Sequence, residues 1–155
     1  MLAEYWPWIA LGLALAIGVA LVAWKIHGRR PVRANIDRAR RLFHLQRERA
    51  EHRFFVLAAS SGKPRGLEWT DCDFEDAVSF ARDRLTGRLR ALVAVTIRFR
   101  AIEGGGMEDN PNVDNPRAAS AVFQFDNDQW ATEGRALFNL NPHEVIEREA
   151  LEAVE

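Results

Sequence analysis

The most apolar part of the sequence is a run of twenty residues, 5–24, that contains no Asp, Glu, Lys, Arg or His. A helix of this length is about 30 Å long, which matches the hydrocarbon thickness of a bilayer. The run has no polar face, so it is not typical of a globular core helix or of a helix lying on a membrane surface. Aromatic side chains, which favour the headgroup level, mark its two ends: Tyr5, Trp6, Trp8 and Trp24. The pattern predicts a single transmembrane anchor within residues 1–28.

Basic residues follow this run, and none precedes it. Residues 25–53 carry ten Lys and Arg against three Asp and Glu, whereas residues 54–155 carry eleven against eighteen. Cleaved signal peptides carry positive charges ahead of the apolar run, so this order favours a retained anchor. The positive-inside rule then predicts a single-pass protein of the cell membrane, with its N-terminus outside and its C-terminal domain in the cytoplasm. The side chains expected to set topology and contact lipid headgroups are Lys25, Arg29, Arg30, Arg33, Arg40 and Arg41.

A basic membrane-proximal helix is predicted over residues 29–52, where Arg, Ala, Leu and Glu dominate. Ile36, Phe43 and Ala50 recur every seven residues. Two such repeats are fewer than a coiled coil requires, so the helix either self-associates or lies against its own domain. The segment has few aromatic residues and precedes an acidic domain, which favours the lipid bilayer over nucleic acid as its partner.

Residues 53–155 are predicted to form an α+β domain with a mainly antiparallel sheet of about four to five strands and two helices packed on one face. The strongest strand signal is the alternation of apolar residues over residues 88–103. The side chains of this strand expected to face the core are Leu89, Ala91, Val93, Val95, Ile97, Phe99 and Ala101.

Apolar stretches bounded by turn residues predict the remaining strands at residues 53–60, 67–69, 118–125 and 129–140. Asp126, Asn127 and Asp128 are residue types that favour a tight turn. The two strands that flank this turn are therefore expected to pair as a β-hairpin.

The two helices are predicted from 3.6-residue spacing and from capping signals. The first covers about residues 70–85, with a buried stripe of Phe74, Ala77, Val78, Ala81 and Leu85. The second runs to about residue 154. It begins with Asn141 as its cap, Pro142 at its first position and Glu144 completing a capping box.

No pattern typical of catalysis or of cofactor binding occurs in the sequence. Cys72 is the single cysteine, which excludes an intrachain disulfide, and His143 is its possible histidine partner within the domain. The three glycines at residues 104–106 lack the Lys and Ser/Thr of a phosphate loop and are followed by acidic residues. We therefore expect no cofactor and a domain that is not an enzyme.

Two acidic clusters are candidates for metal binding. Asp71, Asp73, Glu75 and Asp76 are explained without a metal, because a helix N-terminus attracts negative charge. Glu108, Asp109 and Asp114 lie in an oxygen-rich segment that suits Ca²⁺, but the EF-hand spacing is absent. We expect no metal, with a calcium-responsive domain as an alternative hypothesis.

The segment at residues 104–117 is the candidate recognition loop, because a loop this long in a compact domain is usually functional or disordered. Its candidate contact residues are Met107, Asp109, Asn110, Asn112 and Asp114. The function expected from the whole pattern is a membrane-tethered binding domain that contacts a protein partner or forms a homo-oligomer. The alternative is a small-molecule-binding or enzymatic domain with a pocket between sheet and helix.

Overall fold

The structure, a computed structural model, describes Gly18 and residues 35–154. Gly18 has helical geometry. Outside the described residues lie the predicted anchor and the aromatic and basic side chains assigned to it: Tyr5, Trp6, Trp8, Trp24, Lys25, Arg29, Arg30 and Arg33. Within the described part of the chain, no helix is both long and apolar enough to span a membrane. The chain from Arg41 onward forms one compact unit.

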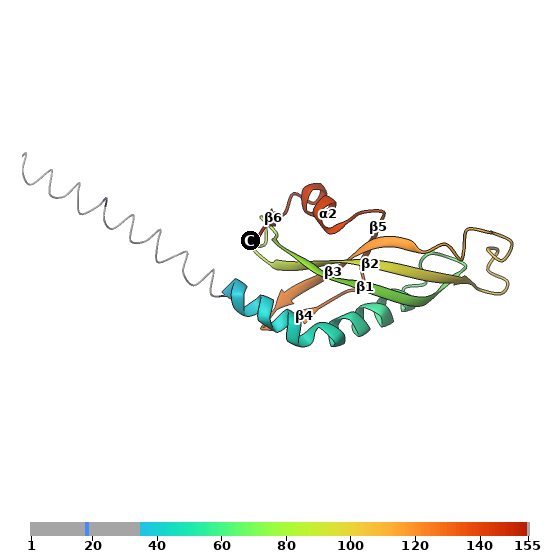
Figure 1. Ribbon diagram of the computed structural model, residues 1–155, viewed down its shortest axis with the longest axis horizontal. Helices are drawn as coiled ribbons and strands as arrows, with labels where there is room; N and C mark the ends of the chain where they lie inside the picture. The colour runs from blue at the N-terminus through green and yellow to red at the C-terminus, as the bar shows by residue number, and fades with distance from the viewer. Residues whose placement is uncertain (1–17, 19–34, 155) are drawn as a thin grey trace, which may run out of the picture. The chain divides into compact units, whose positions relative to one another are not determined.

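An antiparallel sheet forms the centre of this unit. Its six strands are β1 (Leu67–Arg82), β2 (Leu89–Ala101), β3 (Arg117–Asp126), β4 (Gln129–Ala131), β5 (Ala136–Phe138) and β6 (Glu152–Ala153) (Figure 1). The strand order is β4-β3-β2-β1-β6, and β5 also pairs with β3. The predicted α+β class with an antiparallel sheet and two helices is confirmed, with six strands in place of four to five.

In the described part of the chain, two helices cover opposite faces of the sheet (Figure 1). The long helix comprises residues 35–60, of which residues 41–60 belong to this unit and cover the sheet, and α2 comprises Pro142–Arg148. Phe43 and Phe54 of the long helix are fully buried against Phe123 of β3, with ring centroids 5.5 and 5.9 Å away. The other face is covered by a cluster of Ala81, Leu92, Val122, Val145, Ile146 and Leu151. The expectation that both helices share one face is wrong.

The reason lies in β2, whose second face is also apolar in its middle, at Leu92 and Ala94. The predicted strand at residues 88–103 is confirmed, and its core-facing residues from Leu89 to Phe99 are buried on the side of the long helix. Leu92, which points to the opposite side, is also fully buried. A strand that is buried on both faces requires a covering element on each.

Residues 53–60, predicted as a strand, are instead the last turns of the long helix. Ala50, Phe54 and Ala58 are spaced four residues apart, and all three are buried. A short apolar run fits a buried strand and a buried helix equally well, because it has no periodicity of its own. The described part of the predicted membrane-proximal helix therefore continues to residue 60, and its residues 41–60 lie against the sheet.

The helix predicted at residues 70–85 is also wrong, because residues 70–82 belong to β1 and the chain turns after Arg82. Two irregularities in register interrupt β1, one between Trp69 and Asp71 and one between Phe74 and Val78. The β1 residues that pair with the buried odd-numbered residues of β2 from Ala91 to Phe99 are consequently Trp69, Cys72, Phe74, Val78 and Phe80. Their uneven spacing includes steps of three and four residues, which imitate the period of a helix.

The hairpin predicted around Asn127 is confirmed as β3 and β4. Asn127 and Asp128 form its two-residue turn with positive φ values of 48° and 60°. The strand predicted at residues 129–140 is broken into β4 and β5, which both pair with β3. Between them, the Thr132 hydroxyl donates a hydrogen bond of 2.9 Å to the backbone carbonyl of Val122.

α2 begins as predicted. The Asn141 side chain accepts a hydrogen bond of 2.9 Å from the Glu144 backbone, and the Glu144 carboxylate accepts one of 2.7 Å from the Asn141 backbone. The helix ends at Arg148 rather than near residue 154. Ala150 adopts a positive φ of 50°, which turns the chain so that Leu151 is buried in the core and β6 pairs with β1.

Candidate functional site

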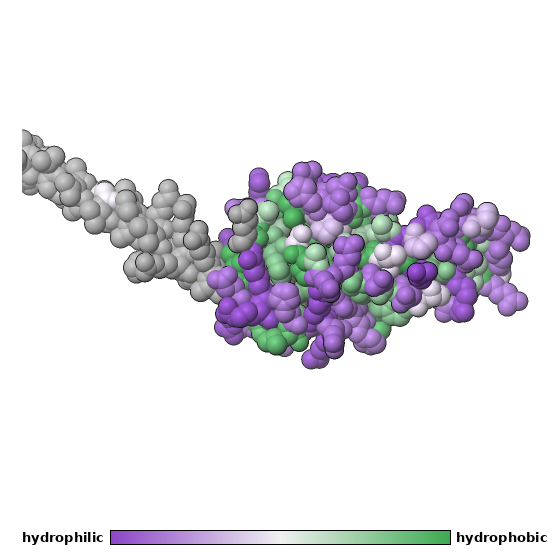
Figure 2. All heavy atoms as spheres, in the orientation of Figure 1, coloured by the Kyte–Doolittle hydropathy of each residue, from purple (hydrophilic) through white to green (hydrophobic). Residues whose placement is uncertain are grey.

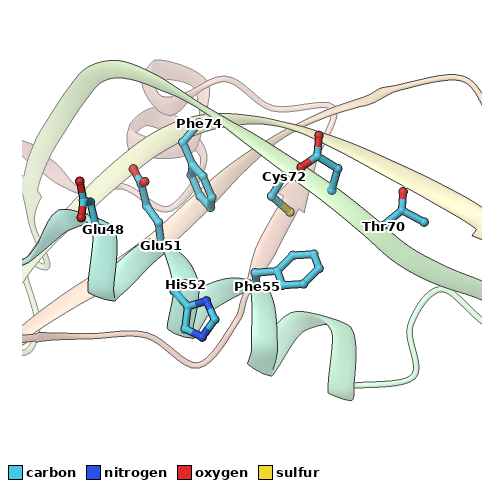
Figure 3. Close-up of a pocket in the computed structure, with 8 residues that line it drawn as sticks. Glu48, Glu51, His52, Phe55, Thr70, Cys72 and Phe74 are labelled. Carbon is cyan, nitrogen blue, oxygen red and sulfur yellow. The ribbon is translucent and has the colours of Figure 1, made fainter.

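A groove of about 360 Å³ lies between the long helix and β1. Figure 3 shows Cys72 and Phe74 directed from β1 toward the helix, which contributes His52 and Phe55. The full lining is Glu48, Glu51, His52, Phe55, Thr70, Asp71, Cys72 and Phe74. This volume is at the small end of the range for ligand sites, roughly 300–1,000 Å³, so the groove suits a few side chains better than a large ligand.

The register of β1 on β2 decides which side chains enter this groove. Cys72 pairs with Ile97, which faces the long helix, and Phe74 follows two residues later on the same face. Asp71 and Asp73 alternate with them, so they belong to the opposite face of the strand, although Asp71 also contributes to the groove lining. The groove therefore has an apolar floor and a carboxylate-bearing rim.

Arg47 of the long helix forms hydrogen bonds to the irregular part of β1 at the end of the groove. Its guanidinium donates hydrogen bonds to the backbone carbonyls of Glu75 and Asp76, the latter at 2.8 Å. Its Nε also donates to the Glu51 carboxylate at 2.6 Å. Backbone groups in a bulge lose their ladder partners, so the arginine satisfies two carbonyls that the irregularity leaves unpaired.

The groove and the adjoining strand carry an excess of negative charge. Arg47 already neutralises Glu51. The carboxylates that form no ion pair with any described residue are Glu48, Asp71, Asp73, Glu75 and Asp76. Carboxylates of one sign along a cleft attract cationic partners and repel anionic ones.

Cys72 has the properties of a packed thiol rather than a nucleophile. Burial, with a smaller contribution from the charge of Asp71, raises the pKa of Cys72 from 9.0 to about 12. Reactive cysteines have a lowered pKa instead. His52 lines the same groove, but no hydrogen bond joins it to Cys72 among the described residues. His143, the possible partner considered from the sequence, lies on α2 with its Nε2 3.4 Å from the Glu147 carboxylate.

We expect iodoacetamide to alkylate Cys72 at least tenfold more slowly in the folded protein than in concentrated urea at the same mildly alkaline pH. The thiolate is the reacting form, and a pKa of about 12 instead of 9.0 makes it about a thousandfold scarcer. Mass spectrometry of the alkylated chain gives the rate, and glutathione corrects for the effect of urea on the reagent. Equal rates in the folded and unfolded protein would contradict a raised pKa of the Cys72 thiol.

The raised pKa of Cys72 also makes the stability of the domain depend on pH. The unfolded chain loses the thiol proton at a lower pH than the folded chain, so the free energy of unfolding falls as pH rises from 9.0 toward about 12.

The predicted recognition loop connects β2 to β3 and projects from one end of the sheet (Figure 1). Hydrogen bonds from the backbone N–H groups of Glu108 and Gly104 hold the pKa of the Glu108 carboxyl below its usual range. Val113 is buried, so the loop has a packed side chain of its own. Of the candidate residues, Met107 and Asn110 are half-buried. The other three, Asp109, Asn112 and Asp114, are exposed. Recognition by this loop stays a prediction.

The structure changes the context of the other predicted residues. Asp71, Asp73, Glu75 and Asp76 lie on a strand, so the helix-end explanation for them is wrong. Among the described residues, no group of three or more His, Cys, Asp and Glu side chains is placed to hold a metal ion. Arg40 and Arg41 lie on the long helix, where Arg41 is exposed. Their contact with lipid stays a prediction.

Sequence reasoning did not identify Glu48, His52 or Phe55 as parts of a site. Glu48 and His52 carry a weak signal, because they lie one turn apart and share a face of the predicted helix. Nothing in the sequence indicates that this face lies beside Cys72, since the segments meet only through the fold. No protein-family model, no curated protein and no solved structure matches the chain.

Proposed function

We propose that this chain is a single-pass protein of the cell membrane whose α+β domain binds another protein on the cytoplasmic side. The observation that carries the proposal is the charge-free run at residues 5–24, bounded by aromatic residues and followed by basic ones. A run of this length and composition has a lower free energy in lipid than in water. The basic residues that follow it favour a cytoplasmic domain.

The packing of the domain supports protein binding over an enclosed small-molecule site. The space between the long helix and the sheet is filled by Phe43, Phe54 and Phe123, whose side chains are fully buried. The groove described above is open to solvent and is lined by side chains of the long helix and of β1. Figure 2 shows a mostly hydrophilic surface in this view, with small separate hydrophobic areas. Such a surface fits a local, polar contact better than a broad apolar interface.

The membrane tether is tested by comparing the full-length chain with the variant L13R/I17R after alkaline washing and ultracentrifugation of membranes. We expect the unmodified chain in the pellet and the variant in the supernatant, because an arginine at the centre of a transmembrane helix costs about 2.5–3.5 kcal/mol. The control L45R/V56R adds the same charge at side chains that are 81% and 48% exposed, and it should stay in the pellet. An uncleaved, unmodified chain in the supernatant would remove the proposal.

The orientation and the partner are tested on intact membranes. Green fluorescent protein fused after the domain should fluoresce, whereas alkaline phosphatase at the same position should be inactive, because each reports one side of the membrane. A carbodiimide, which joins the carboxylates of this domain to the amines of a bound partner, should produce discrete adducts larger than the chain itself. A chain that stays strictly monomeric at all crosslinker concentrations would contradict a role in protein binding.

A further inference from the structure

The side of β1 that faces away from β2 is a free sheet edge along the groove. β6 pairs only with Ala81 and Arg82 of β1, and no other described strand pairs with this side. The N–H and C=O groups that point outward along residues 67–74 therefore have no strand partner among the described residues. Such a row of groups is a template for one more strand.

The irregularities of β1 define which part of this edge is usable. The register is regular over residues 71–74, between the irregularity after Trp69 and the one after Phe74. Beyond Phe74, the carbonyls of Glu75 and Asp76 are already occupied by Arg47. An added strand can thus pair with a window of about four residues, which lies alongside the groove.

We infer that the edge of β1 at residues 71–74 binds a short extended segment of a partner protein as an additional antiparallel or parallel strand, and that this segment alternates basic with apolar side chains. The inference deepens the proposed function, on which it rests, by naming the site and the chemistry of the partner.

The alternation follows from the two faces of β1. A strand paired with β1 lies about 4.8 Å beyond it, and its side chains alternate between the same two faces. Those on the side of the long helix meet Phe55, Cys72 and Phe74, which form an apolar surface. Those on the other side lie next to Asp71 and Asp73, which have no ion pair with any described residue. Apolar side chains suit the first position and lysine or arginine the second.

The negative charges of Asp71 and Asp73 also disfavour pairing of this edge with the same edge of a second copy of the chain. Two β1 edges laid side by side would bring Asp71 and Asp73 of one chain against the same carboxylates of the other. Like charges on neighbouring strands destabilise the pairing, and this is a common way to protect a sheet edge from self-association. The same charges attract a basic segment, so the edge discriminates between the two occupants.

The probe for this site is a fluorescein-labelled eight-residue peptide in which lysine alternates with valine, added to the full-length protein in neutral detergent at low salt. Fluorescence anisotropy should show saturable binding. A peptide with the same side chains but N-methylated at alternate backbone amides should bind at least tenfold more weakly, because it retains the charge and loses the ladder hydrogen bonds. Equal binding of the two peptides would show attraction by charge alone and would overturn the inference.

The location is tested with charge-neutralising variants that leave the backbone unchanged. D71N/D73N should weaken binding of the lysine–valine peptide at least fivefold. The matched control E103Q/E133Q removes two exposed carboxylates outside the groove and outside the candidate recognition loop, and it should bind as the unmodified chain does. Unchanged melting temperatures establish that both variants are folded. An equal loss of binding in both variants would overturn the site.

A peptide with photo-leucine in place of one valine identifies the surface directly. After illumination, adducts on residues 48–55 and 70–74 support the inference, and adducts confined to other segments overturn it. Crosslinks between two copies of the chain through residues 70–74, without peptide, would identify a second copy as the occupant and would also overturn it. The peptide can also fail to bind while the chain stays in the membrane pellet and forms adducts with other proteins. In that case the inference about the edge of β1 is wrong and the proposed function stands.

Discussion

Replacing Phe54 by alanine is expected to lower the free energy of unfolding of the domain by about 3–5 kcal/mol, the usual cost of truncating a buried phenylalanine. The Phe54 side chain is fully buried between the long helix and the sheet. Its ring lies 5.7 Å from that of Phe74, 5.9 Å from that of Phe123 and 6.4 Å from that of Trp69. Neighbours held in a sheet cannot all move inward, so the variant keeps most of the cavity.

Val56→Ala is the matched control, because the two candidate structures of this segment predict different results. In a strand, Phe54 and Val56 share a face, and both truncations would be costly. In the observed helix, Val56 points away from the sheet and is 48% exposed, so its truncation should cost less than about 1 kcal/mol. Urea unfolding of the full-length protein, followed by circular dichroism, measures both values. Similar losses for the two variants would contradict the helical assignment.

The elements predicted correctly are those whose signals are local. β2 and β3 each carry an unbroken series of apolar residues at alternate positions, and their pairing is regular from Arg90 to Ile97. The turn at Asn127 and the capping box at Asn141 depend on residues within a few positions of each other. Signals of this kind are complete within a short window of sequence, so tertiary structure did not alter them.

The elements predicted wrongly are those decided by tertiary contacts. The segment at residues 53–60 is helical because Phe54 and Ala58 continue a stripe that begins at Phe43, and the stripe is visible only once the sheet beneath it is known. In β1, the irregularity between Phe74 and Val78 changes the spacing of the buried residues along the strand. Arg47 of the long helix donates hydrogen bonds to the carbonyls of Glu75 and Asp76 within this irregularity. The periodicity of the sequence indicates neither the sheet beneath the helix nor the irregularity in β1.

The candidate site was predictable only in part, for the same reason. The acidic residues at positions 71–76 stand out as a cluster in the sequence. Whether they mark a helix end or a sheet edge depends on the strand order, which places β1 beside β2 with little on its other side. The second wall of the groove, with His52 and Phe55, comes from a segment that adjoins β1 only in the folded chain.

The long helix also depends on a glycine that no sequence signal identified. Gly134 lies in the link between β4 and β5 and has a positive φ of 71°. A Cβ atom at this position would lie 2.5 Å from the backbone N of Ala58 and 2.8 Å from the backbone carbonyl carbon of Leu57. Backbone atoms of a packed helix cannot shift as the end of a flexible side chain can. The link and the helix therefore approach each other closely only because position 134 has no side chain.

Gly134→Ala should consequently lower the free energy of unfolding by about 2–5 kcal/mol, since the left-handed backbone costs an alanine about 1–2 kcal/mol and the overpacking adds about 1–3 kcal/mol. Gly87→Ala separates the cost of the left-handed backbone from the cost of overpacking. Gly87 has nearly the same φ, 70°, but nothing lies within 4 Å of a Cβ atom built there. Its variant should lose only the conformational part, about 1–2 kcal/mol, in the same urea titration. If the two losses are equal, the close approach of the link to the helix adds nothing to the cost of the substitution, and the predicted clash is wrong.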